Sequence, residues 1–242
     1  MMVRSIRLPP AVTREGWPFD IPAVAALIGG GVTFKRPITF LLGENGSGKS
    51  TIIEAIAEAY GLDVRGGHAG RRYSSELDRG ALGQVLEVRL ALEVPQSRRR
   101  HKGFFLRAET AMGMLEFMSS AGVPGYADNL AQVSHGESFL SALEGRFVDV
   151  GLYLLDEPET PLSFLSTLRL MVYLSQLADA GAQVICATHS PLLSSLPGAE
   201  IIELNETGLH RRKWDELQLV RDWRAFISEP DLYLRHLFSS ED

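Results

Sequence analysis

The chain has 242 residues, of which 45% are hydrophobic and 22% charged, and its formal net charge is −6. This composition is typical of a soluble globular protein with a sizeable core, built as one large domain or two small ones. The acidic balance excludes a basic field over the whole protein, so binding to nucleic acid would need a local basic patch.

The apolar runs predict an alternation of strands and helices along the chain. Short runs broken by proline and glycine fill the first forty residues and indicate strands and turns, with one short helix near residues 23–28. Further strands are predicted at residues 38–42, 85–94, 104–108, 151–155 and 183–188, and helices at 51–60, 111–118, 138–146 and 165–180. This order favours an α/β protein with a largely parallel sheet and an added antiparallel layer from the first hundred residues.

The cysteine content and the apolar segments bear on the compartment. Cys186 is the only cysteine and lies in an apolar run, which predicts a buried, reduced thiol. No apolar stretch approaches the ~20 residues that a membrane span needs, and residues 1–5 do not open a secretory signal. We therefore expect a cytoplasmic protein without a membrane span.

A glycine-rich loop, GENGSGKS, joins the strand at residues 38–42 to the next helix. It matches the pattern G-x-x-x-x-G-K-[ST], whose inward-turned N–H groups and helix N-terminus bind nucleotide phosphates. Lys49 would place its charge on the β- and γ-phosphates, and Ser50 would offer its hydroxyl to Mg²⁺. The residues predicted to bind the nucleotide here are Gly43, Glu44, Asn45, Gly46, Ser47, Gly48, Lys49, Ser50 and Thr51.

Two later strands end in polar residues. Asp156 and Glu157 follow the strand at 151–155, and His189 follows the strand at 183–188. Because ligands of parallel α/β sheets bind at the carboxyl ends of the strands, these side chains should meet the loop. Asp156 is then a candidate to hold Mg²⁺, Glu157 a candidate base for the attacking water, and His189 a candidate partner of the γ-phosphate.

A fourth motif, Val133 to Ser138, precedes a predicted helix and has two interpretations. Polar groups and a glycine at a helix N-terminus make an anion site, which would serve the nucleotide of another subunit because the first loop already holds one. Alternatively, Ser134 caps an ordinary helix together with Glu137. The spacing alone does not choose between them.

These four motifs in this order resemble the ATP-binding cassette (ABC-type) ATPases. GENGSGKS is similar to the Walker A loop, VSHGE to the LSGGQ-type signature, LYLLDEP to Walker B with its catalytic glutamate, and ATHSP to the switch-histidine segment. The runs SHGES, DEPE and THSP look most like the SMC, RecF-like and OLD-like branch. The stretch Trp17–Ala23 and the FFLRAE run are similar to small stand-alone bacterial AAA-type ATPases.

The resemblance implies a P-loop NTPase fold and a head-to-tail homodimer that sandwiches two ATP molecules with Mg²⁺. Ser134, Gly136 and Glu137 would then reach the partner's γ-phosphate. The chain would form one ATPase domain over residues 1–242: a β-rich part with Walker A at 1–110, a helical signature part at 111–150, and Walker B, the switch histidine and C-terminal helices at 151–242.

Several positions depart from the family pattern or stay open. Glu109 is the candidate for the glutamine that contacts metal and water in the family, and the aspartate usually found after Walker B is missing. Lys35 and Arg36 have two interpretations: a contact with adenine or ribose, or a solvated basic turn. The basic run at 98–102 has two as well: a contact with nucleic acid phosphates, or a solvated turn. The region of residues 214–226 is expected to form a helix that covers the core.

Three functions follow from these expectations. The first is an ATPase whose ATP-driven dimerisation moves or clamps a partner, and DNA stays open as that partner. The second is the nucleotide-binding subunit of a transporter, and the third is an ATP sensor that does not hydrolyse. The intact Glu157 and His189 pair favours hydrolysis over sensing.

Overall fold

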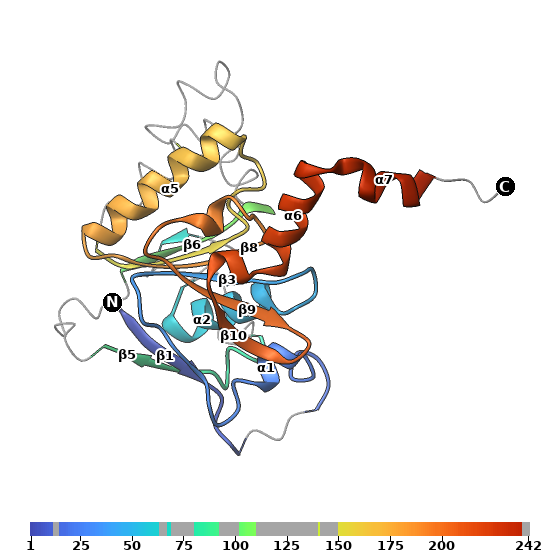
Figure 1. Cartoon of the computed structure of the whole chain (residues 1–242). Coiled ribbons are helices and arrows are strands. Elements are labelled where there is room, and N and C mark those ends of the chain that lie inside the picture. Colours follow the sequence, from blue (N-terminus) through green and yellow to red (C-terminus); the bar gives the residue numbers. More distant parts are fainter. Residues whose placement is uncertain are drawn as a thin grey trace.

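A computed structural model describes residues 1–11, 15–62, 67–68, 80–91, 102–109, 140 and 150–238. Figure 1 shows two sheets with helices packed around them and two C-terminal helices that lead away from this body. None of the helices among these residues has the length and apolar character that crossing a lipid bilayer requires.

The larger sheet has seven strands, and its five inner strands run parallel. The outer strands β10 and β4 pair antiparallel with their neighbours. The spatial order is β10 (Gly208–Arg212), β9 (Glu200–Asn205), β3 (Ile38–Leu42), β8 (Gln183–Thr188), β7 (Leu152–Asp156), β6 (Gly103–Arg107) and β4 (Gly67–His68). The expected α/β class with a mostly parallel sheet is confirmed.

The smaller sheet supplies the expected antiparallel layer. Its order is β2 (Val32–Thr33), β1 (Val3–Arg7) and β5 (Glu87–Leu90), with β1 antiparallel to both neighbours. Of the predicted strand 85–94, the structure shows β5 at Glu87–Leu90. Residues 81–85 form a turn, and residues 92–94 lie outside the described part. The layer packs on the same core as one face of the larger sheet.

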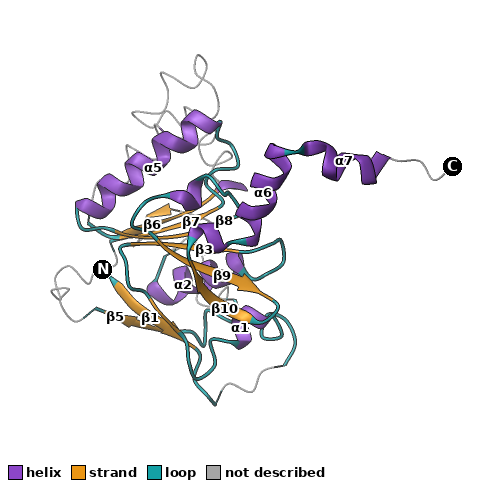
Figure 2. Ribbon diagram, in the orientation of Figure 1, coloured by secondary structure: helices purple, strands orange, loops and turns teal. Residues whose placement is uncertain are grey.

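Side chains on the two faces of the larger sheet pack in two separate cores. Figure 2 shows helices α2 and α5 on opposite sides of this sheet. On β3, Leu41 packs in the core with helix α2 (Lys49–Tyr60), whereas Phe40 packs in the core with helix α5 (Phe164–Asp179). This two-residue period follows from the pleat of a strand and explains why β3 is apolar at almost every position. Both helices agree with their predicted positions.

The remaining helical segments are short or peripheral. They are α1 (Pro22–Ala25), the 3₁₀ segments Leu193–Ser195 and Trp214–Glu216, and the helices α6 (Gln218–Ser228) and α7 (Pro230–Phe238). The expectation that the C-terminal helix covers the core is wrong beyond Val220. Leu217 and Val220 are buried, but Trp223 and Phe226 are exposed because the helix leaves the body after its first turn.

The predicted helices at 111–118 and 138–146 fall outside the described residues, apart from Leu140. That residue is helical and buried in the core on the α5 side of the sheet. Of the basic run at 98–102, the structure describes Lys102, whose side chain is exposed.

A buried glutamine connects the two sheets. The Gln183 side chain at the start of β8 accepts hydrogen bonds from the backbone N–H groups of Met2 and Val3, each at 2.7 Å. It also donates to the Val3 carbonyl at 2.9 Å, and the residue is fully buried. Because the larger sheet meets β1 here without strand pairing, this side chain satisfies backbone groups that would otherwise be orphaned.

We predict that Gln183→Leu lowers the free energy of unfolding by about 3 kcal/mol, because it leaves three buried backbone groups without partners. Urea unfolding measures this loss. The exposed Gln176 on α5 offers a matched control, and Gln176→Leu should change stability by less than about 0.5 kcal/mol. Equal stability of the two variants would contradict this role of Gln183.

Candidate nucleotide site

The phosphate loop runs from the end of β3 into the first turn of α2. Gly48 is the N-cap of α2 at φ 95°, a left-handed conformation that favours glycine. A Cβ on Gly43 would lie 2.5 Å from the Leu204 carbonyl oxygen, so the start of the loop has no room for a side chain. The open N-terminus of α2 therefore faces the concave side of a close-fitting loop, as phosphate binding requires.

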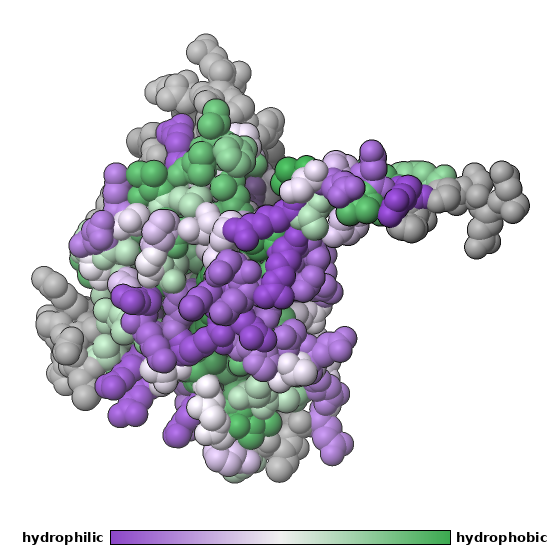
Figure 3. All heavy atoms as spheres, in the orientation of Figure 1, coloured by the Kyte–Doolittle hydropathy of each residue, from purple (hydrophilic) through white to green (hydrophobic). Residues whose placement is uncertain are grey.

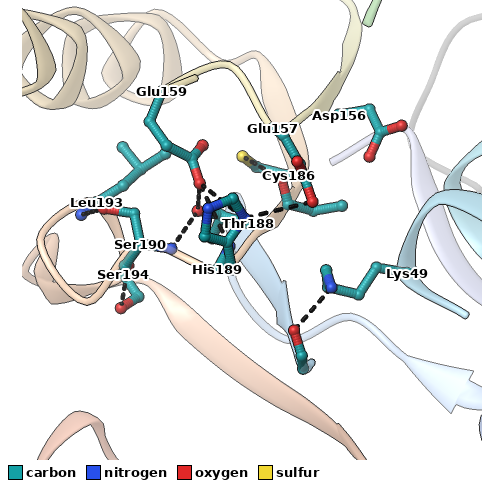
Figure 4. Close-up of polar contacts among 12 residues, drawn as sticks. Lys49, Asp156, Glu157, Glu159, Cys186, Thr188, His189, Ser190, Leu193 and Ser194 are labelled. Atoms are coloured by element: carbon teal, nitrogen blue, oxygen red, sulfur yellow. Dashed lines mark hydrogen bonds and ion pairs between the residues drawn. The ribbon is translucent and has the colours of Figure 1, made fainter. Parts of the chain in front are cut away.

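The Lys49 ammonium group is folded onto the loop. Its Nζ donates to the carbonyl oxygens of Gly43 at 2.7 Å and Glu44 at 2.8 Å. Burial lowers the pKa of Lys49, while Glu157 and Asp156 oppose that shift. Figure 4 shows this side chain on the other side of the site from the Glu159 and Thr188 cluster, so its charge remains next to the loop.

Ser50 and Asp156 meet directly, although 106 positions separate them in sequence. The Ser50 hydroxyl donates to Asp156 Oδ1 at 2.9 Å, and Asp156 is only 4% exposed. Burial raises the pKa of Asp156, whereas the Ser50 hydrogen bond and the charge of Arg107 lower it. The structure thus brings the two predicted metal-binding oxygens together at one edge of the sheet.

The donor set at this edge fits Mg²⁺ bound with a nucleotide. A hydroxyl and a carboxylate oxygen are hard ligands, and Mg²⁺ takes few protein ligands when phosphates supply the others. Among the described residues there is no cluster of three or more His, Cys, Asp or Glu side chains that could hold a metal ion alone. Within the same set of residues, Ser47 Oγ in the loop is buried and has no hydrogen-bond partner, which leaves it available to a phosphate oxygen.

Glu157 and His189 face each other beyond the ends of β7 and β8. His189 Nδ1 lies 3.3 Å from Glu157 Oε1, and the Glu157 N–H donates to the Ala187 carbonyl at 2.9 Å (Figure 4). Glu157 has φ 50°, a left-handed conformation that costs a non-glycine residue about 1–2 kcal/mol. Such strained residues are often found at functional sites, and this one turns Glu157 away from the strand direction of Asp156.

Glu159 belongs to the same cluster, and sequence reasoning did not single it out. Its Oε1 accepts a short hydrogen bond from the Thr188 hydroxyl and a longer one, 3.3 Å, from the His189 N–H. The Thr188 hydroxyl in turn accepts from the Ser190 N–H at 3.0 Å. Glu159 therefore fixes the loop that carries His189. The acidic run DEPE was the sequence feature that could have indicated Glu159. That run does not distinguish a glutamate that binds a ligand from one that holds a neighbouring loop in place.

Arg107 is the second residue that sequence reasoning missed. It ends β6 directly opposite Asp156 in the parallel register, with its Nε 3.8 Å from Asp156 Oδ2. Its guanidinium also pairs with Glu54 of α2 at 2.5 Å and with Glu109 at 3.2 Å. Glu109, the predicted metal-contacting residue, is 79% exposed and approaches Asp156 through Arg107, so its direct role at the metal stays a prediction.

The roles of the other predicted residues stay predictions. Ser134, Gly136 and Glu137 of the signature-like motif lie outside the described residues. Lys35 and Arg36 are exposed, and the Lys35 N–H donates to Glu200 Oε2 at 3.0 Å. Their contact with a nucleotide base therefore also stays a prediction.

Two family models match separate parts of the chain. Residues 30–82 match a model described as an AAA domain. Residues 138–195 match a model described as an AAA domain, putative AbiEii toxin, type IV TA system. The first match includes the phosphate loop, and the second includes Asp156, Glu157 and His189.

Curated relatives and a solved structure also match this chain. The ribose import ATP-binding protein RbsA 1 of Burkholderia cenocepacia (strain HI2424) is 29% identical over 85% of this chain and 42% of its own length. RbsA 1 of Burkholderia ambifaria (strain ATCC BAA-244) is 30% identical over 76% of this chain and 38% of its own length. The solved structure of a putative metal-chelate type ABC transporter in an inward-facing conformation is 14% identical to this chain, with a TM-score of 0.50. The match covers 94% of this chain and 89% of that one.

The fold is that of an ABC-type ATPase head, a class of P-loop NTPase. The family models and the ATP-binding relatives support the expectation that the chain is an ATPase. The chain spans about two fifths of the length of the curated relatives. Those relatives are transporter ATP-binding proteins, so the finer placement in the SMC, RecF-like and OLD-like branch stays a prediction.

We predict that Arg107→Met lowers the free energy of unfolding by about 2 kcal/mol, because the half-buried Glu54 and the buried Asp156 lose their shared cation. Adding Glu54→Gln to this variant should restore part of the loss, whereas Glu54→Gln alone should destabilise the protein. A double-mutant cycle in urea measures this coupling. Strictly additive effects would show that the ion pair does not stabilise the fold.

Proposed function

We propose that this chain binds and hydrolyses ATP with Mg²⁺, and that two copies close around two nucleotides in a head-to-tail homodimer. The observation that carries the proposal is the meeting of Ser50 of the phosphate loop with Asp156 at the end of β7. Glu157 and His189 stand at the same edge. These residues come from three separate parts of the chain and share one place only in the fold.

Each described residue has a role that its position supports. The loop N–H groups and Lys49 would bind the phosphates, while Ser50 and Asp156 would hold Mg²⁺, which would supply positive charge against the phosphates. Glu157 accepts a proton from the water that attacks the γ-phosphate, and the bond from phosphorus to the bridging oxygen of ADP breaks. His189, held by Glu159 through its backbone, orients that water or the γ-phosphate.

The second copy enters through the signature-like motif. Ser134, Gly136 and Glu137 would bind the γ-phosphate of the partner's nucleotide, because this chain already has a phosphate loop of its own. In this arrangement, binding of ATP favours the closed dimer and hydrolysis favours its opening. The closed and open states would act on a partner of this chain, with DNA as one candidate.

A transporter ATP-binding subunit is the second candidate function. The ribose import relatives favour it, since they are 29% and 30% identical to this chain. The motifs SHGES, DEPE and THSP favour the other branch. A permease encoded beside the gene, with ATP hydrolysis that depends on that permease, would decide for the transporter.

We predict that Glu157→Gln traps a dimer in the presence of ATP and Mg²⁺, because binding persists while proton transfer to the carboxylate is lost. Size-exclusion chromatography should show the dimer, and phosphate release should fall by about 10²-fold or more. Chelation of Mg²⁺ by EDTA should abolish both the turnover of the parent chain and the trapped dimer. If the parent chain and Glu157→Gln both bind ATP with the same negligible turnover, the chain is a sensor instead.

We predict that Ser134→Arg leaves ATP binding by the monomer intact and abolishes ATP-dependent dimerisation, because the arginine would occupy the space of the partner's γ-phosphate. Binding of a fluorescent ATP analogue and light scattering measure the two properties separately. Equal loss of both would place Ser134 in its own subunit's site and refute the assignment across the interface.

We predict that DNA, if it is the partner, raises the ATPase rate in a way that weakens with salt, because phosphate contacts release counterions. The rate measured with and without DNA over a salt series tests this. A rate that DNA leaves unchanged at every salt concentration would remove DNA as the partner.

A further inference from the structure

The C-terminal arm, defined here as residues 221–238, leads away from the body (Figure 1). Val220 is its last buried neighbour in α6, and every residue from 221 to 233 is exposed. Two contacts give the arm a defined start and bend. The Arg224 guanidinium lies 4.8 Å from the Trp214 ring, and the rings of Phe226 and Tyr233 meet edge to face at 5.9 Å.

The arm exposes large apolar side chains along its whole length. Ile227, Leu237 and Phe238 are 69–78% exposed, and hydrophobic and hydrophilic residues lie side by side along the arm in Figure 3. The exposed large apolar side chains of the arm are Trp223, Phe226, Ile227, Leu232, Tyr233, Leu237 and Phe238. Together they present on the order of 800 Å² to solvent, which is about the area that each partner contributes to a standard interface. A protein contact would remove much of this apolar area from water.

The charges of the arm favour a second copy as the occupant. Three arginines, Arg221, Arg224 and Arg235, balance three acidic residues, Asp222, Glu229 and Asp231. Two such arms can therefore meet without a net charge repulsion between them. A nucleic acid or an anionic membrane would instead require a basic excess, which the arm lacks.

We propose that the arm pairs with the arm of a second copy about a two-fold axis and holds two chains together when no nucleotide is bound. The role of this pairing rests on the proposed function. Two ATPase heads tethered by their arms would meet at an effective concentration of about millimolar, which favours their closure around ATP. The pairing itself requires no nucleotide. Its test can therefore fail or succeed independently of ATP hydrolysis.

Sedimentation of the nucleotide-free chain over a dilution series tests the pairing. The parent chain should form dimers, and the double variant Ile227→Glu with Leu237→Glu should dissociate at least about tenfold more readily. Val172→Glu on α5 is the control, because Val172 is an apolar residue away from the arm and is also mostly exposed, at 59%. Unchanged thermal unfolding of the double variant would show that its body remains folded.

A cross-linking experiment distinguishes arm-to-arm contact from other dimers. Ser228 lies near the middle of the arm, where a two-fold axis brings a residue next to its own copy. Ser228→Cys should yield a covalent dimer with a short bismaleimide, whereas Asp179→Cys at the end of α5 should not, and the native Cys186 is buried.

Three results would overturn the proposal. They are a nucleotide-free parent chain that is monomeric at every concentration, a double variant that dimerises like the parent, and a parent chain that binds vesicles through the arm as a monomer. Loss of ATP-dependent closure with arm pairing intact would instead refute the proposed function and leave this inference standing.

Discussion

The parallel register of the larger sheet is the constraint on which the site depends. Asp156 at the end of β7 stands opposite Ala187 of β8 and Arg107 of β6, and Leu42 of β3 stands opposite Thr188. The phosphate loop, the acidic pair and the His189 loop therefore all begin at the same edge. A slip of one residue in any pairing would exchange its core-facing side chains between the two faces, so the two packed cores hold the site in register.

Negative charge is concentrated at this edge, and nearby basic side chains partly neutralise it. Asp156, Glu157 and Glu159 lie close together, and burial raises the pKa of both Asp156 and Glu159. Lys49 and Arg107 provide the nearby positive charge, the first against the loop carbonyls and the second against Asp156. A nucleotide triphosphate would add further negative charge. In the proposed site, binding would draw on the N–H groups of the loop and on a divalent cation held by Ser50 and Asp156.

The sequence predicted those elements whose own residue pattern is enough to identify them. The strands β3, β7 and β8 are short, nearly continuous apolar runs, which fit a strand buried on both faces. The phosphate loop has a specific glycine pattern. The roles of Arg107 and Glu159 depend instead on which residues the register places opposite each other, and no local pattern reports that. The C-terminal helix was misjudged for a related reason, since its apolar spacing is the same whether it covers the core or leaves it.

The two proposed contacts between chains, the nucleotide sandwich and the paired arms, require interfaces of different strength. A nucleotide sandwich must open after each hydrolysis, so its interface must be weak when ATP is absent. A dimer built only on that interface would dissociate between cycles and search for its partner again. The arm lies outside the nucleotide edge, and its apolar side chains do not depend on phosphate or metal. Contact through the arm would thus let the heads separate locally while the pair persists, which joins a switchable interface to a constant one.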